Sequence, residues 1–258
     1  MAAVEIVDVD ARNVDETTFF CMQSKQDSPG YLRKRRWLDK RFSEGLRILM
    51  LGRRDKKRWA GERGYIEYIP GEYAWRAVCA ADYLFIHCLW VVGKSRGKGG
   101  ARALVDRCIA DAKKGGFVGV AAVTAENGFA TGRKFYEHLG FEVAAECNPR
   151  ITLVAHRLKK RAKLPEFSSG AIRGPSHYKK GLTIIRSDQC PYNEEATRII
   201  STEAKRLGIE SIREIDLKSA DAVRRRAPTP FGVFATVMDG RLLSYRYLTP
   251  RELRKAIG

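Results

Sequence analysis

The chain has 258 residues, of which 44% are hydrophobic, and a formal net charge of +18 at pH 7. This length allows one large domain or two modest ones. No apolar run approaches the roughly 20 residues that span a bilayer, and the acidic start MAAVEIVDVD does not resemble a signal peptide, so we expect a cytoplasmic protein without a membrane segment. The six cysteines form no C-x-x-C pair and the four histidines are scattered, which argues against a metal site.

The first part of the chain predicts short strands and helices followed by a hairpin. Apolar patterns predict a strand at 4–9, helices at 17–22 and 31–42, and a strand at 46–51. Segments 64–69 and 73–79 predict a hairpin that turns at Pro70-Gly71. Carboxylates and aromatic rings are dense in this hairpin, a mixture that suits a cationic amine. The alternative is a half-exposed sheet with aromatic cross-strand pairs.

The next stretch, from Tyr83 to Val92, is apolar on both faces and predicts a buried central strand. A basic, glycine-rich turn follows at 93–100, and then a helical pattern over 101–114. Glycines let backbone N–H groups approach a phosphate closely, and a helix N-terminus adds partial positive charge. The spacing fits neither a P-loop nor a dinucleotide-binding motif. The stretch nevertheless has the physical character of a site for a diphosphate-bearing ligand.

Two motifs give this part of the chain a family resemblance. The sequence RGKGGA at 96–101 resembles the acetyl-CoA loop Q/R-x-x-G-x-G/A of the GCN5-related N-acetyltransferase (GNAT) family, with Val91 at the expected place before it. The sequence KFYEHLGFE at 134–142 resembles the family's second signature. The resemblance covers about residues 4–158 and implies an α/β (α+β) fold, a mixed β-sheet flanked by helices. Its remaining elements are a strand at 117–124, a helix within 128–138, and strands at 141–145 and 151–158.

The resemblance implies acetyl-CoA as the co-substrate, with no metal. The backbone at the end of the central strand is expected to pair with the pantetheine arm, and the turn to hold the pyrophosphate. The expected cofactor-binding residues are Leu89, Trp90, Val91, Val92, Arg96, Gly97, Lys98, Gly99, Gly100 and Ala101. Asn127 and Arg133 are further candidates, although Asn127 stands farther from Tyr136 than the family's asparagine does.

The family transfers acetyl directly from acetyl-CoA to a primary amine, which requires a general base and a general acid for the departing thiolate. Tyr136 matches the family's tyrosine and is the candidate acid. The strand glutamate that serves as the base in some relatives falls at Phe85 here. His87, on the same face of the predicted strand, and Glu67, in the predicted hairpin, are therefore rival candidate bases.

The sequence does not identify the acceptor, and a small-molecule amine, a peptide N-terminus and a protein lysine all fit. In the family the helices after the first strand wall the acceptor site, and the predicted hairpin adds carboxylates beside aromatic rings. The candidate acceptor-side residues are Tyr31, Trp37, Tyr68, Glu72, Tyr73 and Trp75.

The last hundred residues predict a second unit. Residues 159–180 are rich in Pro, Gly, Ser and Lys and predict a linker or wrapped arm. The order βαβ-ββα follows, with Cys190-Pro191-Tyr192 at its first helix and Thr229-Pro230 before its third strand. These features resemble the thioredoxin/glutaredoxin fold, with Pro230 as its cis-proline and Pro228 as the competing choice. The whole resembles proteins that carry a YoaP-type C-terminal domain.

We therefore expect a GNAT domain at 1–158, a linker or arm at 159–180, and a small thioredoxin-like domain at 181–258. Asn193 stands where glutaredoxins have their second cysteine, which argues against a dithiol cycle, but Cys190 at a helix N-terminus could react as a monothiol. The absent strand glutamate and the +18 charge leave two other functions open. One is a degenerate domain that only binds acyl-CoA, and the other is nucleic-acid binding, for which no motif is present. The sequence gives no signal for the oligomeric state.

Overall fold

The computed structural model describes residues 5–55, 58–61, 63–126, 131–147 and 151–257, without side chains for 53–60. The chain forms two compact units. The N-terminal unit comprises Met1–Ser24, Leu38–Ala74 and Ala80–Glu166, and the C-terminal unit comprises Lys25–Trp37, Trp75–Cys79 and Phe167–Gly258. Over the described ranges, no helix combines the length and apolar character needed to cross a bilayer.

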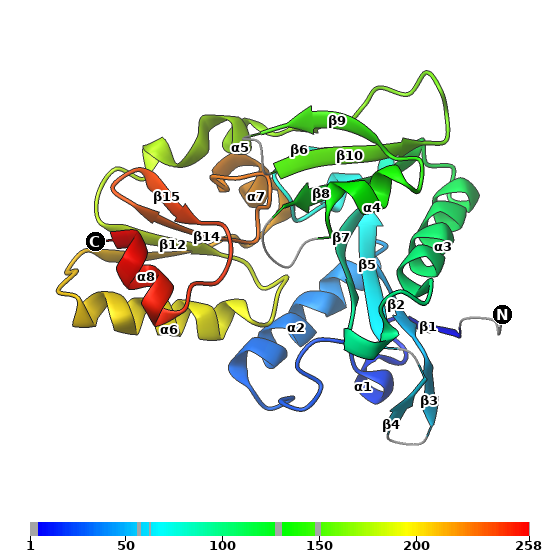
Figure 1. Cartoon of the computed structure of the whole chain (residues 1–258), viewed down its shortest axis with the longest axis horizontal. Coiled ribbons are helices and arrows are strands. Elements are labelled where there is room, and N and C mark those ends of the chain that lie inside the picture. Colours follow the sequence, from blue (N-terminus) through cyan, green and yellow to red (C-terminus); the bar gives the residue numbers. More distant parts are fainter. Residues whose placement is uncertain (1–4, 56–57, 62, 127–130, 148–150, 258) are drawn as a thin grey trace. The chain divides into compact units, whose positions relative to one another are not determined.

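The N-terminal unit is built on a seven-stranded sheet in the order β1-β2-β5-β7-β8-β10-β9 (Figure 1). Its strands are β1 (Ile6–Val9), β2 (Arg47–Leu51), β5 (Gly64–Pro70), β7 (Tyr83–Val91), β8 (Gly119–Ala125), β9 (Glu142–Glu146) and β10 (Ile151–Arg157). The short pair β3 (Arg53–Asp55) and β4 (Arg58–Ala60) stands apart. The helices are α1 (Val14–Thr17), α2 (Pro29–Ser43), α3 (Gly100–Lys114) and α4 (Arg133–Glu137), and α2 runs from one unit into the other. The mixed sheet flanked by helices is the architecture that the sequence predicts.

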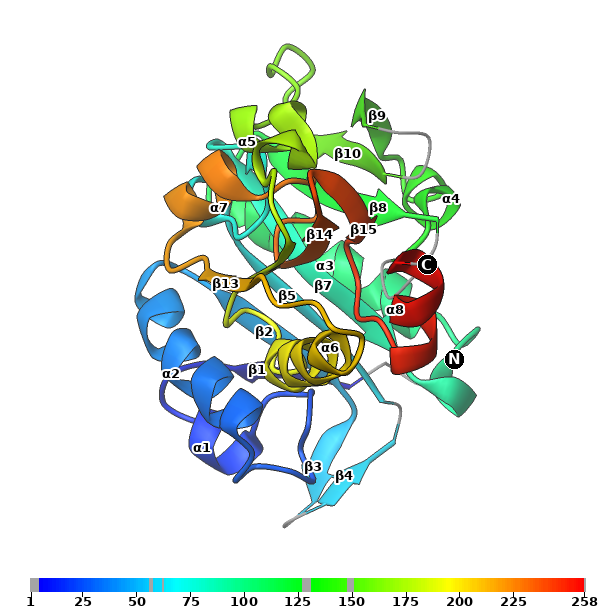
Figure 2. The same cartoon turned by 90° about the vertical axis from the view of Figure 1, so that its left-hand side faces the viewer.

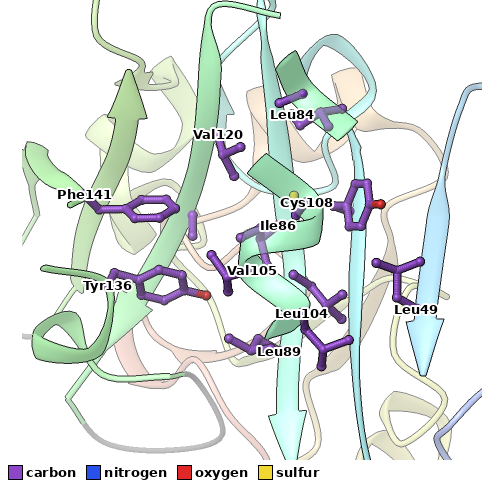
Figure 3. Packing of buried hydrophobic residues seen from close by; sticks show 14 of the residues in the cluster. Leu49, Leu84, Ile86, Leu89, Leu104, Val105, Cys108, Val120, Tyr136 and Phe141 are labelled. Carbon is purple, nitrogen blue, oxygen red and sulfur yellow. The ribbon is translucent and has the colours of Figure 1, made fainter. Parts of the chain in front are cut away.

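The central strand β7 is buried because helices and neighbouring strands supply apolar partners for it. Leu104, Val105 and Cys108 of α3 lie over Ile86 and Leu89 of β7, as Figure 3 shows. Tyr136 and Phe141 close the same cluster from the side of α4 and β9. Removing this much apolar surface from water is the main stabilising contribution available to such a sheet, and it fixes the position of the turn between β7 and α3.

The predicted hairpin between 64–69 and 73–79 is wrong. Residues Gly71–Tyr73 form a 3-10 turn, and only Val78–Cys79 form a strand (β6), which pairs with β11 (Glu166–Phe167). The reason is that β5 already has β2 on one edge and β7 on the other. Segment 71–80 leaves the sheet and returns beside Gly71, so closely that a Cβ there would lie 1.9 Å from the carbonyl oxygen of Ala80.

The predicted helix at 17–22 is also displaced. Helix α1 ends at Thr17, because Thr18 adopts φ 58° and ψ 175°, and residues 21–24 form a turn in which Met22 has φ 57°. Non-glycine residues rarely occupy positive φ. The segment 18–23, which we call the α1–α2 turn, therefore has two strained backbone positions.

The C-terminal unit contains a four-stranded sheet in the order β13-β12-β14-β15. Strand β13 is parallel to β12, whereas β14 is antiparallel to both β12 and β15. Figure 2 shows α6 and α8 on one side of this sheet. The elements are β12 (Leu182–Arg186), α6 (Asn193–Arg206), β13 (Ile212–Asp216), α7 (Ala220–Arg226), β14 (Phe234–Met238), β15 (Arg241–Ser244) and α8 (Pro250–Ile257). This is the predicted βαβ-ββα order, and the description of the unit as thioredoxin-like stays a prediction.

Two features of this unit differ from the sequence predictions, namely the structure of the linker and the peptide bonds before Pro228 and Pro230. The predicted linker or arm contains β11, α5 (Ser169–Arg173) and the 3-10 turn Gly174–His177, and the Ser168 hydroxyl donates to Arg224 O at 2.7 Å. The described peptide bonds include no cis bond, so the prediction of a cis bond before Pro230 or Pro228 is wrong. A trans bond is the form that an X–Pro sequence itself favours.

A capping box starts α8, and it leads to a testable pH effect. Thr249 N donates to Glu252 Oε2 at 2.9 Å, Glu252 N donates to Thr249 Oγ1 at 3.2 Å, and Arg246 lies 2.7 Å from the same carboxylate. The hydrogen bond from Arg246 and those from Thr249 lower the pKa of Glu252 to about 2. Because the folded pKa lies below the unfolded value, the stabilisation is complete above about pH 4.5 and is lost as the pH falls toward 2.

We therefore expect Glu252→Gln to lower the free energy of unfolding at pH 7 by about 1 kcal/mol or less, since the half-exposed carboxylate is partly screened by solvent. At pH 3 the variant and the wild type should differ less. Urea denaturation at the two pH values measures this. Glu210→Gln removes the same charge from an exposed residue between α6 and β13, and it should not reproduce the pH-dependent difference.

Candidate active site

A buried pair of titratable side chains lies at the centre of the N-terminal sheet. Strands β5 and β7 pair with an irregularity, so that Glu67 is opposite Cys88 and Tyr68 is opposite Ile86. His87 is therefore the extra residue of a β-bulge, a feature that re-aims a side chain. Its Nδ1 lies 3.1 Å from Glu67 Oε1, and the two side chains are 0% and 3% exposed. The structure thus joins the two residues that the sequence treats as rival bases.

Next to this pair the sheet opens on one edge of β7. The parallel ladder between β7 and β8 runs from Tyr83 to Ile86 and, among the described residues, goes no further. Val92 N donates to Arg63 O, toward β5, and backbone groups alternate in direction along a strand. The backbone N–H and C=O groups of Leu89 and Val91 therefore face the open edge. In agreement, Leu89 O accepts from the Thr131 hydroxyl at 3.2 Å, and Val91 O accepts from Arg96 Nε at 3.0 Å.

The glycine-rich turn continues from this edge. A 3-10 turn, Gly93–Ser95, leads to Gly99, which caps the N-terminus of α3. Gly97 and Gly99 have φ 76° and 85°, and a Cβ at either would meet no atom within 4 Å. The first N–H groups of a helix have no partner inside the helix. The turn therefore presents bare backbone donors beside the exposed Lys98, and these features fit a diphosphate.

Side-chain contacts hold the turn in place. The Arg96 guanidinium lies 5.2 Å from the centre of the Trp90 ring, and the Ser95 hydroxyl accepts from Arg63 N at 2.8 Å. These contacts fix the turn against the ends of β5 and β7 while its tip stays exposed. Residues 127–130 lie outside the described part of the chain, so the structure gives no position for Asn127.

Comparison with known proteins shows which family this part of the chain resembles. Residues 17–141 match the acetyltransferase (GNAT) family. The chain contains an acetyltransferase domain of the GNAT family. It is also 28% identical over 254 residues to "Uncharacterized N-acetyltransferase YoaP" of Bacillus subtilis (strain 168), which covers 97% of each chain. The chain is accordingly an acetyl-CoA-dependent acetyltransferase.

Solved acetyltransferases resemble about three fifths of the chain. YncA of Salmonella typhimurium, solved with acetyl-CoA, is 18% identical and covers 62% of this chain and 97% of its own, with a TM-score of 0.43. The N-acetyltransferase YhbS of Escherichia coli, solved with CoA, is 18% identical and covers 60% and 81%, with a TM-score of 0.40.

Two predicted residues of the acetyltransferase domain lie on α4, with different surroundings. Tyr136 is buried and its ring packs edge-on against Phe135 and Phe141, with centroids 5.3 and 5.1 Å away. Figure 3 shows its hydroxyl directed toward Val105 and Leu89. Arg133 is exposed, and its guanidinium binds Glu137 and Glu146, each at 2.6 Å. The guanidinium is thus already engaged by two carboxylates of its own domain.

The predicted acceptor residues are divided between the two units. Tyr31, Trp37 and Trp75 belong to the C-terminal unit, where the two tryptophan rings pack edge-on with centroids 5.3 Å apart. Glu72 and Tyr73 are exposed on the 3-10 turn that follows β5.

Tyr68 packs and forms a hydrogen bond on the α3 side of the sheet. It packs in the core cluster with α3, and its hydroxyl donates to Asp111 of that helix. Burial is the main cause that raises the pKa of Tyr68 far above its ordinary value. Its phenol therefore stays protonated, which suits a donor within the core.

The sequence missed Tyr65, which lies on the same face of β5 as Glu67. The Phe20 ring stacks on Tyr65 with centroids 4.7 Å apart, and the Tyr65 hydroxyl contacts the sulfur atoms of Cys21 and Cys88. Burial, with smaller contributions from the two cysteines, raises the pKa of Tyr65 well above its ordinary value. The α1–α2 turn therefore covers the face of the sheet that carries Glu67. Alternation along β5 was the one available signal, because it places Tyr65 beside Glu67.

Cys190 lies in the C-terminal unit just before α6. Its sulfur is 2.6 Å from the Tyr247 hydroxyl. Asn193, at the place of a second cysteine, is buried and donates to Ser187 O and Val233 O at 2.6 and 3.0 Å. The asparagine amide therefore holds two backbone segments together, and it has no thiol that could resolve a mixed disulfide at Cys190. A monothiol role for Cys190 stays a prediction.

Proposed function

We propose that this chain transfers acetyl from acetyl-CoA to a primary amine by direct attack, with the Glu67–His87 pair as its proton acceptor. The observation that carries the proposal is the buried contact of 3.1 Å between His87 Nδ1 and Glu67 Oε1. The pair stands on the central strands, next to the point where the β7–β8 ladder ends.

The pair can act as a base through the tautomer that it favours. A carboxylate accepts from Nδ1–H, which leaves Nε2 of the ring with a lone pair for a proton. The resulting imidazolium is stabilised by the carboxylate beside it, as in other carboxylate–histidine pairs. Both side chains are almost fully buried, so we propose that the proton of the amine reaches His87 through an ordered water.

The other parts of the site bind and orient. Acetyl-CoA supplies the acetyl group as a thioester. The backbone at Leu89 and Val91 would align the pantetheine arm along the open edge of β7, and the turn at Arg96–Ala101 would hold the pyrophosphate. Tyr136, whose hydroxyl points toward this strand, would give a proton to the departing thiolate.

The acceptor class follows from the groups on the covered face. A buried carboxylate favours a cationic amine, and Glu67 shares its face of β5 with the aromatic residue Tyr65, against which Phe20 stacks. We propose a small amine or a peptide amine that enters on the side of the α1–α2 turn.

The proposal is tested by release of CoA from acetyl-CoA over a panel of amines: polyamines, aminoglycosides, amino acids, and peptides with a free N-terminus or lysine. At least one class should give release that depends on both the amine and the protein. If acetyl-CoA raises the Tm but no amine increases CoA release, the proposed transfer to a primary amine is wrong.

A further inference from the structure

Two cysteines meet at one tyrosine hydroxyl in the N-terminal unit. Cys21, in the α1–α2 turn, has its sulfur 3.3 Å from the Tyr65 hydroxyl. Cys88, on β7 opposite Glu67, has its sulfur 2.8 Å from the same hydroxyl. The two sulfur atoms can therefore be separated by no more than the sum of these two contacts, although the cysteines are far apart in the sequence.

The backbone around Cys21 is strained in a way that supports movement of this sulfur. Thr18 and Met22 both have positive φ and stand on either side of Cys21. Such positions are energetically unfavourable and persist where the surroundings hold them, often at switch regions. The contacts that hold this turn are the stacked Phe20 and Tyr65 rings and Gln23, which accepts from Arg63 at 3.3 Å.

The surroundings of the two thiols allow reaction. Both cysteines are half-buried, and neither is joined in a disulfide in this structure. A disulfide needs an S–S distance of about 2 Å, so one side chain must rotate and displace the Tyr65 hydroxyl. Cys88 lies between His87 and Leu89, that is, between the proposed base and the proposed pantetheine edge.

We propose that Cys21 and Cys88 are a reversible modification site whose co-reactant is a low-molecular-weight disulfide such as oxidised glutathione. One thiol, as its thiolate, attacks the oxidant and releases one glutathione thiol. The second attacks the resulting mixed disulfide, so that the Cys21–Cys88 bond forms and a second glutathione thiol leaves. The two cysteines are oxidised and the reagent is reduced. The bond ties the α1–α2 turn to β7 and thereby closes the acceptor face.

The experiment treats the full chain with oxidised glutathione, blocks remaining thiols, and maps the disulfides by mass spectrometry of peptides. We expect one peptide pair that joins Cys21 to Cys88 and that disappears after dithiothreitol. The same pair should form in Cys79→Ser, which removes an exposed cysteine elsewhere, and should be lost in Cys21→Ser. Glutathione bound singly at both sites, a bond to any other cysteine, or no reaction at Cys21 and Cys88 would overturn the proposal.

Thermal unfolding and acetyl-transfer assays test whether the Cys21–Cys88 bond closes the acceptor face. Oxidation should raise the Tm of wild type, because the cross-link restricts the unfolded chain, and dithiothreitol should reverse the rise. Where an acceptor is known, oxidation should abolish acetyl transfer by wild type but not by Cys21→Ser. Neither the peptide map nor the Tm depends on acetyl transfer, so they can fail or succeed independently of the proposed function. A Tm rise of equal size in Cys21→Ser contradicts the site.

Discussion

Substitution of Gly99 by glutamate is expected to abolish the rise in Tm that acetyl-CoA produces. Gly99 caps the N-terminus of α3 with φ 85°, and a side chain there would extend into open space beside the turn. The carboxylate would face the diphosphate at the point where backbone donors converge. Because like charges in contact cost several kcal/mol, we expect binding to weaken by about 100-fold or more, which corresponds to about 2.7 kcal/mol. Thermal shift and calorimetric titration with acetyl-CoA measure this.

The chain offers a matched control at the other end of the same helix. Gly116 also has positive φ, 76°, and a Cβ there also meets no atom within 4 Å. Gly116→Glu therefore introduces the same charge and a similar backbone strain about 25 Å away along α3. It should lower the Tm of the unliganded protein about as much as Gly99→Glu does, yet keep the acetyl-CoA shift. If Gly99→Glu keeps a full shift, the turn does not hold the cofactor.

Removal of either member of the buried pair is expected to have the second large effect. Glu67→Gln and His87→Gln keep polar side chains of similar size but prevent His87 from accepting a proton with support from a carboxylate. We expect each to lower kcat by about 100-fold to 10,000-fold, with the acetyl-CoA shift unchanged. Because the residues act as a unit, the double variant should be little slower than the single ones. Stopped-flow or steady-state CoA release measures these rates.

Tyr68→Phe is the control for a buried polar group on the same strand. It removes the hydroxyl that donates to Asp111 on the α3 side of the sheet, so it should lower the Tm while kcat stays within a few-fold of wild type. If Glu67→Gln instead behaves like Tyr68→Phe, the Glu67–His87 contact serves stability, and another group accepts the proton of the amine.

Local signals in the sequence determined a large part of this fold. The apolar run at 83–92 predicts β7, the glycines and basic residues that follow predict the turn, and the helical pattern predicts α3. The order of elements after residue 181 follows in the same way from short-range periodicity. These features are predictable because a strand, a glycine turn or a helix start depends on residues close in sequence.

Only the tertiary structure decided the partners across the sheet. It brings Glu67 to His87, Tyr65 to Cys21 and Cys88, and Tyr68 to Asp111. It also pairs Val78–Cys79 with β11 instead of β5. The predicted hairpin was wrong for the same reason, since it required a pairing with β5 that does not form. Which edge a strand pairs with, and at which residue a bulge falls, is set by competition among segments distant in sequence. A shift of one residue reverses which side chains share a face, so no local pattern could fix these contacts.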